Sequence, residues 1–223
     1  QYKPRKVEIG RRSNPADTVE QSLHEVPKSQ KIHLLKHLLE DNALYSVLVF
    51  TRTKYGADRV AKQLSRSKIP SGAIHSNRSQ NQRARALQDF KDGKTRVLVA
   101  TDIAARGIDV EGITHVINFD FPPHAEDYVH RIGRTGRANA VGKAISFITS
   151  DDHGPLRTLE RLIKRKIALV RPQGFDAKAE RPPASDHPKR GQGFNPHGQS
   201  RPEGGGGSNR NRRRRPGQRR VGR

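Results

Sequence analysis

The hydrophobic residues of this chain form short apolar runs that alternate with stretches of helical spacing. Runs of strand length lie at residues 19–26, 47–50, 72–75, 97–100, 115–119 and 144–148, and helical spacing extends over residues 31–40, 55–65, 79–90, 125–133 and 156–166. Strands separated by helical segments of this length form right-handed βαβ units. The pattern therefore predicts an α/β domain of three layers, with a mainly parallel sheet between helices.

Two of the predicted strands, Val47–Phe50 and Val97–Ala100, are apolar throughout, which is typical of parallel strands covered on both faces. In such sheets, ligands bind beyond the carboxyl ends of the strands. The loops that follow Phe50, Ala100 and Phe119 are therefore expected to share one functional edge.

The two ends of the chain lack this periodicity. Residues 1–18 are polar and basic, and because the chain starts at Gln1 without a Met, we expect a linker from an upstream domain of a longer protein. Residues 172–223 contain a Gly run, an Arg run and almost no apolar side chain, which predicts a disordered basic tail. Residues 19–171 remain as the predicted folded domain.

The chain is strongly basic, with 44 Lys and Arg against 22 Asp and Glu and a formal net charge of +22. This excess favours a polyanionic partner, nucleic acid first and a membrane surface second. The absence of Cys excludes disulfides, thiolate metal sites and cysteine nucleophiles. No apolar run approaches the roughly 18–20 residues of a bilayer span, so we expect a cytoplasmic protein without a membrane partner.

The strongest cluster of candidate chemistry is the segment His130-Arg131-Ile132-Gly133-Arg134-Thr135-Gly136-Arg137. Arg134 and Arg137 are three residues apart, with Gly136 between them. A guanidinium presents a planar fork of donors that suits phosphate oxygens, and glycine allows a close backbone approach. These residues predict a clamp for a polyphosphate, while an ordinary basic surface turn is the alternative that charge alone leaves open.

No segment has the pattern of a phosphate-binding P-loop. Gly93-Lys94-Thr95 resembles the end of one, but Gln88 stands where the motif needs a Gly, and a helical pattern precedes it where a strand is needed. No acidic cluster follows a predicted strand either, so we expect no metal site in this chain. A nucleotide at the arginine clamp therefore requires a second domain.

Three further polar segments lie at predicted strand ends: Phe50-Thr51-Arg52-Thr53-Lys54, His75 with Gln80 and Arg83, and Ala100 to Asp109. In the last segment, Thr101 offers a hydroxyl to a phosphate, Arg106 and Gly107 suit a close backbone approach, and Asp109 could accept hydrogen bonds from a ribose. For Thr101 and Asp109 taken alone, an ordinary capping role is the better interpretation.

Together and in this order, these segments resemble the C-terminal RecA-like domain of superfamily 2 helicases of the DEAD-box class. Residues 130–137 match motif VI, residues 99–109 motif V, residues 49–54 motif IV, and Gln80 to Arg83 the Gln-x-x-Arg element. The resemblance covers residues 19–171, and with the basic tail the chain looks most like the bacterial RhlE type. Ser76 departs from the family, which usually has Gly after the His.

The resemblance implies a RecA-like fold and half of an ATP-dependent RNA helicase that separates RNA duplexes locally and remodels RNA–protein complexes. ATP with Mg²⁺ would be held mainly by an N-terminal RecA-like domain, over which this chain closes. Arg134 and Arg137 would act as arginine fingers, His130 would couple the ATP and RNA sites, and Asp109 and Gly107 would contact ATP. We therefore expect the isolated chain to be inactive as an ATPase.

The resemblance also implies RNA contacts, mostly to the backbone and with little sequence specificity. The implied residues are Thr53, Arg52, Gln80, Arg83, Thr101 and Arg106. Two alternatives remain open at this point: a non-catalytic RNA-binding or annealing module, and a DNA helicase domain of similar geometry. The sequence indicates no oligomeric state.

Overall fold

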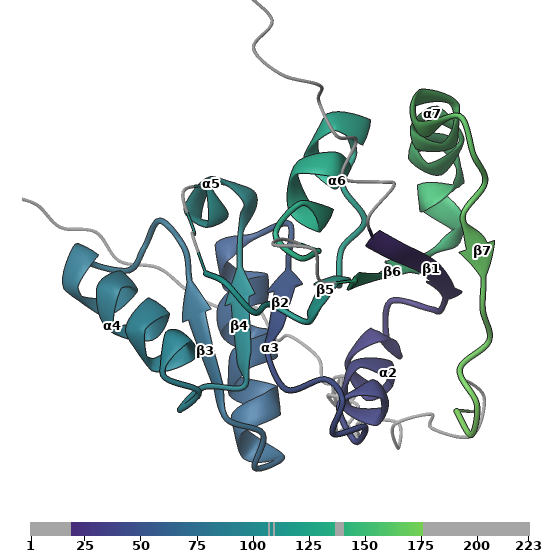
Figure 1. Ribbon diagram of the computed structural model, residues 1–223. Coiled ribbons are helices and arrows are strands. Elements are labelled where there is room, and N and C mark those ends of the chain that lie inside the picture. Colours follow the sequence, from purple (N-terminus) through teal and green to yellow (C-terminus); the bar gives the residue numbers. More distant parts are fainter. Residues whose placement is uncertain (1–18, 107, 109, 137–140, 176–223) are drawn as a thin grey trace, which may run out of the picture. The chain divides into compact units, whose positions relative to one another are not determined.

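The computed structural model describes residues 19–106, 108, 110–136 and 141–175. Within them, seven strands form a single sheet in the order β3-β4-β2-β5-β6-β1-β7, and every adjacent pair is parallel (Figure 1). The strands are β1 Val19–Glu25, β2 Val47–Phe50, β3 Ser71–Ile74, β4 Val97–Ala100, β5 His115–Asn118, β6 Gly142–Ile148 and β7 Ala168–Leu169.

Helices connect the strands. They are α2 Lys31–Leu38, α3 Lys54–Arg66, α4 Gln80–Lys91, α5 Asp102–Ala105, α6 Ala125–Ile132 and α7 His153–Ile163, and a 3₁₀ turn, η1 Ser150–Asp152, precedes α7. None of the described helices is long and apolar enough to cross a lipid bilayer.

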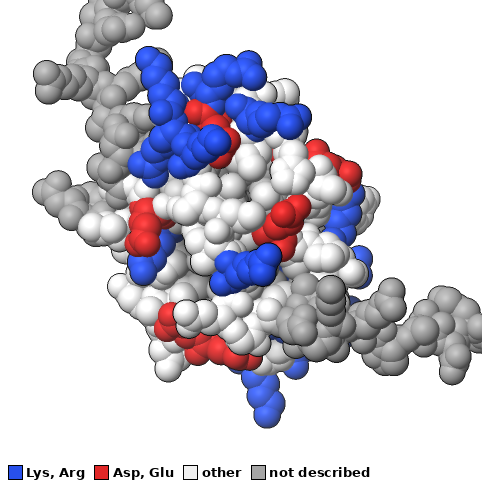
Figure 2. Space-filling model, turned by 90° about the vertical axis from the view of Figure 1, so that its right-hand side faces the viewer, with Lys and Arg blue, Asp and Glu red and all other residues white. Residues whose placement is uncertain are grey.

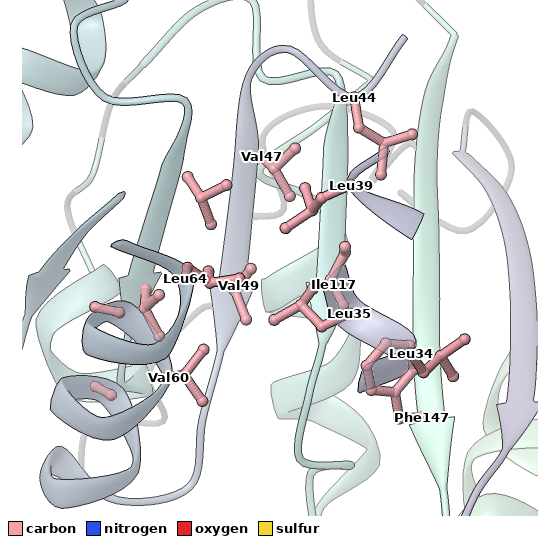
Figure 3. Packing of buried hydrophobic residues seen from close by; sticks show 14 of the residues in the cluster. Leu34, Leu35, Leu39, Leu44, Val47, Val49, Val60, Leu64, Ile117 and Phe147 are labelled. Carbon is pink, nitrogen blue, oxygen red and sulfur yellow. The ribbon is translucent and has the colours of Figure 1, made fainter. Parts of the chain in front are cut away.

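The core lies on both faces of the sheet because successive strand residues point to opposite sides. Val47 and Val49 of β2 belong to the cluster that α2 and α3 complete, which includes Leu35 and Leu64 (Figure 3). Phe50 faces the other way, among residues of α4 and α5. Residues of α6 and α7 form a third cluster with β1 and β6. The predicted three-layer α/β/α arrangement with a parallel sheet is therefore confirmed.

All predicted strands and helices are present, with shifts of a few residues at their ends. Two elements were not predicted, α5 and β7, because four and two residues are too short to show a periodicity. Ser29 is not the cap of α2, as its sequence position suggested. Gln30 occupies that place and makes no side-chain capping bond. Gly93 ends the α4 segment at a φ of 73°, and β4 follows, so the P-loop interpretation fails structurally.

Side chains cap the two helices that start after β2 and β3. Thr53 Oγ1 accepts a 3.0 Å hydrogen bond from the backbone N–H of Gly56. Ser79 and Gln82 form a reciprocal capping box at the start of α4. These caps hold the polar segments after the two strands in defined positions.

Two buried histidines predict how the stability of the domain depends on pH. Burial lowers the pKa of His24 in β1 and of His115 in β5 below their ordinary value of 6.5. Around and below pH 6.5 the unfolded chain therefore binds more protons than the folded one. The stabilisation is complete above pH 6.5 and declines as the pH falls through the lower, folded-state pKa values.

We expect the free energy of unfolding, measured by urea denaturation, to fall between pH 7 and pH 5, and to fall less steeply in His24→Gln. Glutamine can keep a polar contact at this position but does not take up a proton. The matched control is His124→Gln, because His124 is exposed. An unchanged acid slope in His24→Gln would contradict the assignment.

Candidate functional site

The carboxyl ends of the parallel strands bring three of the predicted polar segments to one edge of the sheet, called here the carboxyl edge. Phe50 pairs with Ala100, and Ala100 pairs with Ile74. Beyond these pairs, the Thr51 N–H donates to the Ala100 carbonyl at 3.0 Å, and the Thr101 N–H to the Ile74 carbonyl at 3.4 Å. The segments after β2, β3 and β4 are therefore direct neighbours, as the sequence predicted.

The β2–α3 segment is held from below by a buried hydroxyl. Thr51 is fully buried, and its Oγ1 donates to the Thr53 carbonyl at 3.2 Å. Thr53 Oγ1 accepts its bond from Gly56, which leaves the hydroxyl proton of Thr53 for another acceptor. Thr53 is therefore positioned to donate to a ligand at this edge.

Arg52 is turned toward the loop between β5 and α6. Its backbone N–H donates to Asp120 Oδ2 at 2.9 Å, and its Nη2 donates to the Phe121 carbonyl at 3.2 Å. The buried ammonium of Lys31 reaches the same loop, donating to the Phe119 carbonyl at 2.8 Å. Desolvation lowers the pKa of Lys31, and the nearby Asp120 carboxylate opposes this shift. Arg52 still leaves 60% of its side chain exposed.

The β3–α4 segment is tied to α3 by charge. His75 Nε2 lies 2.9 Å from Asp58 Oδ1, and Arg78 Nη2 donates to the same oxygen at 2.6 Å. Partial burial would raise the pKa of Asp58, but these two hydrogen bonds outweigh it, and the pKa lies below its usual value. Arg83 Nη1 lies 3.4 Å from Gln80 Oε1, so the predicted Gln-x-x-Arg pair meets on the first turn of α4.

Arg131 forms the densest polar contact of the site. Its Nε and Nη2 donate to the two carboxylate oxygens of Asp102 at 2.6 and 2.8 Å. Its Nη1 donates to Asn118 Oδ1 at 3.1 Å and to the Asp120 carbonyl at 2.7 Å. The guanidinium lies 5.0 Å from the centroid of the Phe50 ring. Arg131 is 3% exposed and therefore fastens α6 to α5 and the ends of β2 and β5.

The sequence analysis assigned no role to Arg131, although it lies in the motif. The available signal was its position three residues after Tyr128 and beside Ile132, on the buried stripe of α6. A charged residue on such a stripe needs a partner, and Asp102 is that partner. Arg131 and Asp102 are the site residues that sequence reasoning missed.

The last turn of α6 and the residues after it bring the other motif VI side chains to α5. A small hollow of about 20 Å³ is lined by Phe50, Asp102, Ala105, Arg106, Asp127, His130, Arg131 and Arg134. Arg134 Nη1 donates to the Ile108 carbonyl at 3.1 Å, and His130 is exposed. Three predicted residues, Arg106, His130 and Arg134, thus meet in one place. The predicted residues Gly107, Asp109 and Arg137 lie outside the described part of the chain.

Other surfaces of the described domain carry mixed charge. A hollow of about 500 Å³ over β3, between α3 and α4, contains Asp58 and Asp89 as well as Lys62 and Arg85, and none of the predicted site residues. The face seen in Figure 2 also shows Asp and Glu side chains between the Lys and Arg side chains. These surfaces are less suited to a polyanion than the carboxyl edge.

The parallel sheet with helices on both faces defines a RecA-like α/β domain. The helicase conserved C-terminal domain family matches residues 30–139. The chain also aligns with the Escherichia coli DEAD-box protein SrmB, crystallised with the regulator of ribonuclease activity A, at 35% identity and a TM-score of 0.64, covering 68% of this chain and 89% of that chain. The chain therefore belongs to the helicase C-terminal domain family of DEAD-box proteins.

Longer relatives show the same similarity. The DEAD-box ATP-dependent RNA helicase CshA of Geobacillus kaustophilus is 40% identical over 177 residues, or 79% of this chain and 38% of that protein. The ATP-dependent RNA helicase RhlB of Pseudomonas syringae pv. tomato is 43% identical over 169 residues, or 76% of this chain and 43% of that protein. The chain thus spans less than half the length of these relatives.

Proposed function

We propose that this chain is the C-terminal half of an ATP-dependent RNA helicase and acts by closing over ATP held on an N-terminal RecA-like domain. The observation that supports this most directly is the bidentate contact between Arg131 and Asp102. Asp102 follows Thr101, a proposed RNA contact, and Arg131 lies between His130 and Arg134, the proposed nucleotide contacts. One rigid contact therefore joins the two proposed sites, so binding at one can change the position of the other.

The hollow beside α5 and α6 suits the phosphates of ATP. Arg134 donates to a neutral carbonyl there, and a phosphate oxygen would replace that acceptor with a charge-assisted bond about twice as strong. Arg134, with Arg137, stabilises charge on the transferred phosphoryl group, and His130 links the two sites without acting as a base. Gly107 and Asp109 complete the proposed ATP contacts.

The proposed cofactor is ATP with Mg²⁺. When bound, it supplies the phosphoryl group for hydrolysis, and the metal neutralises part of its charge. The described residues contain no group of three or more His, Asp or Glu side chains that could hold a metal ion. We therefore assign Mg²⁺ to the N-terminal domain, and assign to this chain the cations that face the phosphates.

The carboxyl edge suits the backbone of an RNA strand. It presents the hydroxyls of Thr53 and Thr101 and the guanidinium of Arg83 at the ends of adjacent strands. Such donors bind phosphate and sugar oxygens, which contain little sequence information. Arg52, Gln80 and Arg106 extend the same contact. This arrangement supports RNA binding with weak sequence preference and target choice elsewhere in the protein.

Two finer assignments belong to the proposal. The basic residues after position 172 favour the RhlE type among bacterial DEAD-box proteins, although the relatives named above are CshA and RhlB. A cytoplasmic location follows from the proposed substrate.

The isolated chain is expected to bind single-stranded RNA and to show no ATP turnover, because arginine fingers act only on a nucleotide that another domain holds. Phosphate release by the purified chain at saturating ATP and RNA tests this directly. The control is the longer protein read from the same gene, which should hydrolyse ATP when RNA is present. Turnover by the isolated chain contradicts the composite site. A longer protein that binds RNA without turnover favours the non-catalytic annealing module.

A further inference from the structure

Tyr55 is a large aromatic side chain left exposed at the carboxyl edge. It is the second residue of α3, lies two positions after Thr53, and is 72% exposed. Single exposed apolar side chains are common and need no function by themselves. The neighbours of Tyr55, however, differ from those expected of an incidental surface residue.

A fixed cation lies beside the Tyr55 ring. Lys54 Nζ is 5.3 Å from the ring centroid and donates a 2.9 Å hydrogen bond to Asn77 Oδ1. That bond joins the start of α3 to the loop that leads to Gln80 and Arg83. Both segments that are proposed to bind RNA therefore meet at Tyr55. Because Lys54 restrains the ring from one side, covering the exposed side of the ring costs little further side-chain freedom.

We propose that Tyr55 is a stacking platform for one base of the RNA strand that lies along the carboxyl edge. This rests on the proposed function, because it requires the RNA backbone at Thr53 and Arg83. A strand whose phosphates are held there has its bases free to turn away from the backbone contacts. A tyrosine ring stacks on any base, so Tyr55 fixes the position of the strand without reading its sequence. Lys54 adds a cation beside the same nucleotide.

Tyr45 provides a matched comparison on the same strand. It precedes β2 and is 66% exposed, whereas Tyr55 follows β2 and has a similar exposure. Tyr45 therefore lies at the amino end of β2, away from the proposed RNA contacts. The chain has no Trp, and Tyr128 is fully buried. Tyr55 is thus the exposed tyrosine of the described domain that follows a strand.

The first test compares the affinity of the full 223-residue chain for a single-stranded oligouridine among three variants. Tyr55→Ala should bind roughly tenfold more weakly, within the range expected for one lost aromatic–base stack, while Tyr55→Phe and Tyr45→Ala should match the parent. Stacking involves no ions, so the ratio between parent and Tyr55→Ala should stay constant when the salt concentration is doubled. Thermal melts confirm that each variant is folded.

The second test does not depend on the overall affinity, to which the basic residues after position 172 also contribute. An oligonucleotide with 5-iodouridine is cross-linked to the chain by light, and the chain is digested with trypsin. Tyr55 then lies in the peptide of residues 55–59 and Tyr45 in that of residues 37–52. The cross-link is expected in residues 55–59.

Each outcome decides between the platform and the underlying site. Unchanged binding by Tyr55→Ala together with no cross-link in residues 55–59 overturns the platform. If Arg83→Ala still weakens binding in that case, the proposed RNA site stands without it. Equal losses in Tyr55→Phe and Tyr55→Ala mean that the hydroxyl is the contact, and stacking is wrong. Unchanged binding by Arg83→Ala as well overturns the RNA site and the platform together.

Discussion

Replacing Arg134 with alanine in the two-domain enzyme is expected to lower RNA-stimulated ATP hydrolysis by about 10³–10⁵-fold, the usual contribution of an arginine finger. Arg134 is partly exposed, and its Nη1 donates to the Ile108 carbonyl. Water can satisfy an acceptor in such a position, so the variant should remain folded. Most of the ATP affinity should persist as well, because the proposed nucleotide site lies mainly on the other domain. The measurement is steady-state phosphate release together with nucleotide binding.

Two control variants separate this effect from a loss of positive charge. Arg134→Lys keeps the charge but lacks the planar fork of donors, and we expect it to recover little activity. Arg157→Ala removes an exposed arginine from α7, on a different helix, and should leave turnover unchanged. Turnover of Arg134→Ala within tenfold of the parent would show that Arg134 is no finger.

Arg131→Ala is expected to lower the free energy of unfolding of the chain by about 3 kcal/mol, the lower end of the cost of breaking a buried ion pair. The substitution leaves Asp102 and Asn118 without the donors they have in the native structure. The lower end applies because the Asp102 side chain is 32% exposed and can be hydrated. Urea denaturation of the purified chain measures the change.

The matched control for Arg131 is again Arg157→Ala, which should change stability by less than about 0.5 kcal/mol. A double-mutant cycle with Asp102→Ala should give a coupling energy of at least about 1 kcal/mol, because the two side chains are in direct contact. Additive effects in the cycle would show that the bidentate contact adds nothing of its own. In that case, Arg131 could not join the two proposed sites.

The different expectations for Arg131 and Arg134 could not be derived from the sequence. Both are arginines within the same motif, and charge and spacing alone describe them alike. In the structure, Arg131 points into the sheet and meets Asp102, which lies 29 residues earlier in the chain. Arg134 comes after the end of α6 and stays partly exposed. The distinction between a structural and a catalytic arginine therefore depends on a long-range contact.

Much of the carboxyl edge, by contrast, was predictable. The uninterrupted apolar run Val47–Phe50 predicted a strand covered on both faces, and the structure confirms one with all four residues buried. Because parallel strands end at the same edge, the polar residues that follow them were expected to lie together, and Thr51 and Thr101 do. The short helix α5 was missed, since four residues show no helical period.

The sequence by itself determined the alternation of strands and helices, the parallel sheet and the chemistry available at the strand ends. These follow from periodicity, which is a local property with a repeat of two or 3.6 residues. Only the tertiary structure decided the strand order, in which β1 lies beside β6, the burial of Arg131, and the Lys54–Asn77 bond beside Tyr55. Each of these depends on residues far apart in the chain, whose meeting is decided by how the layers pack.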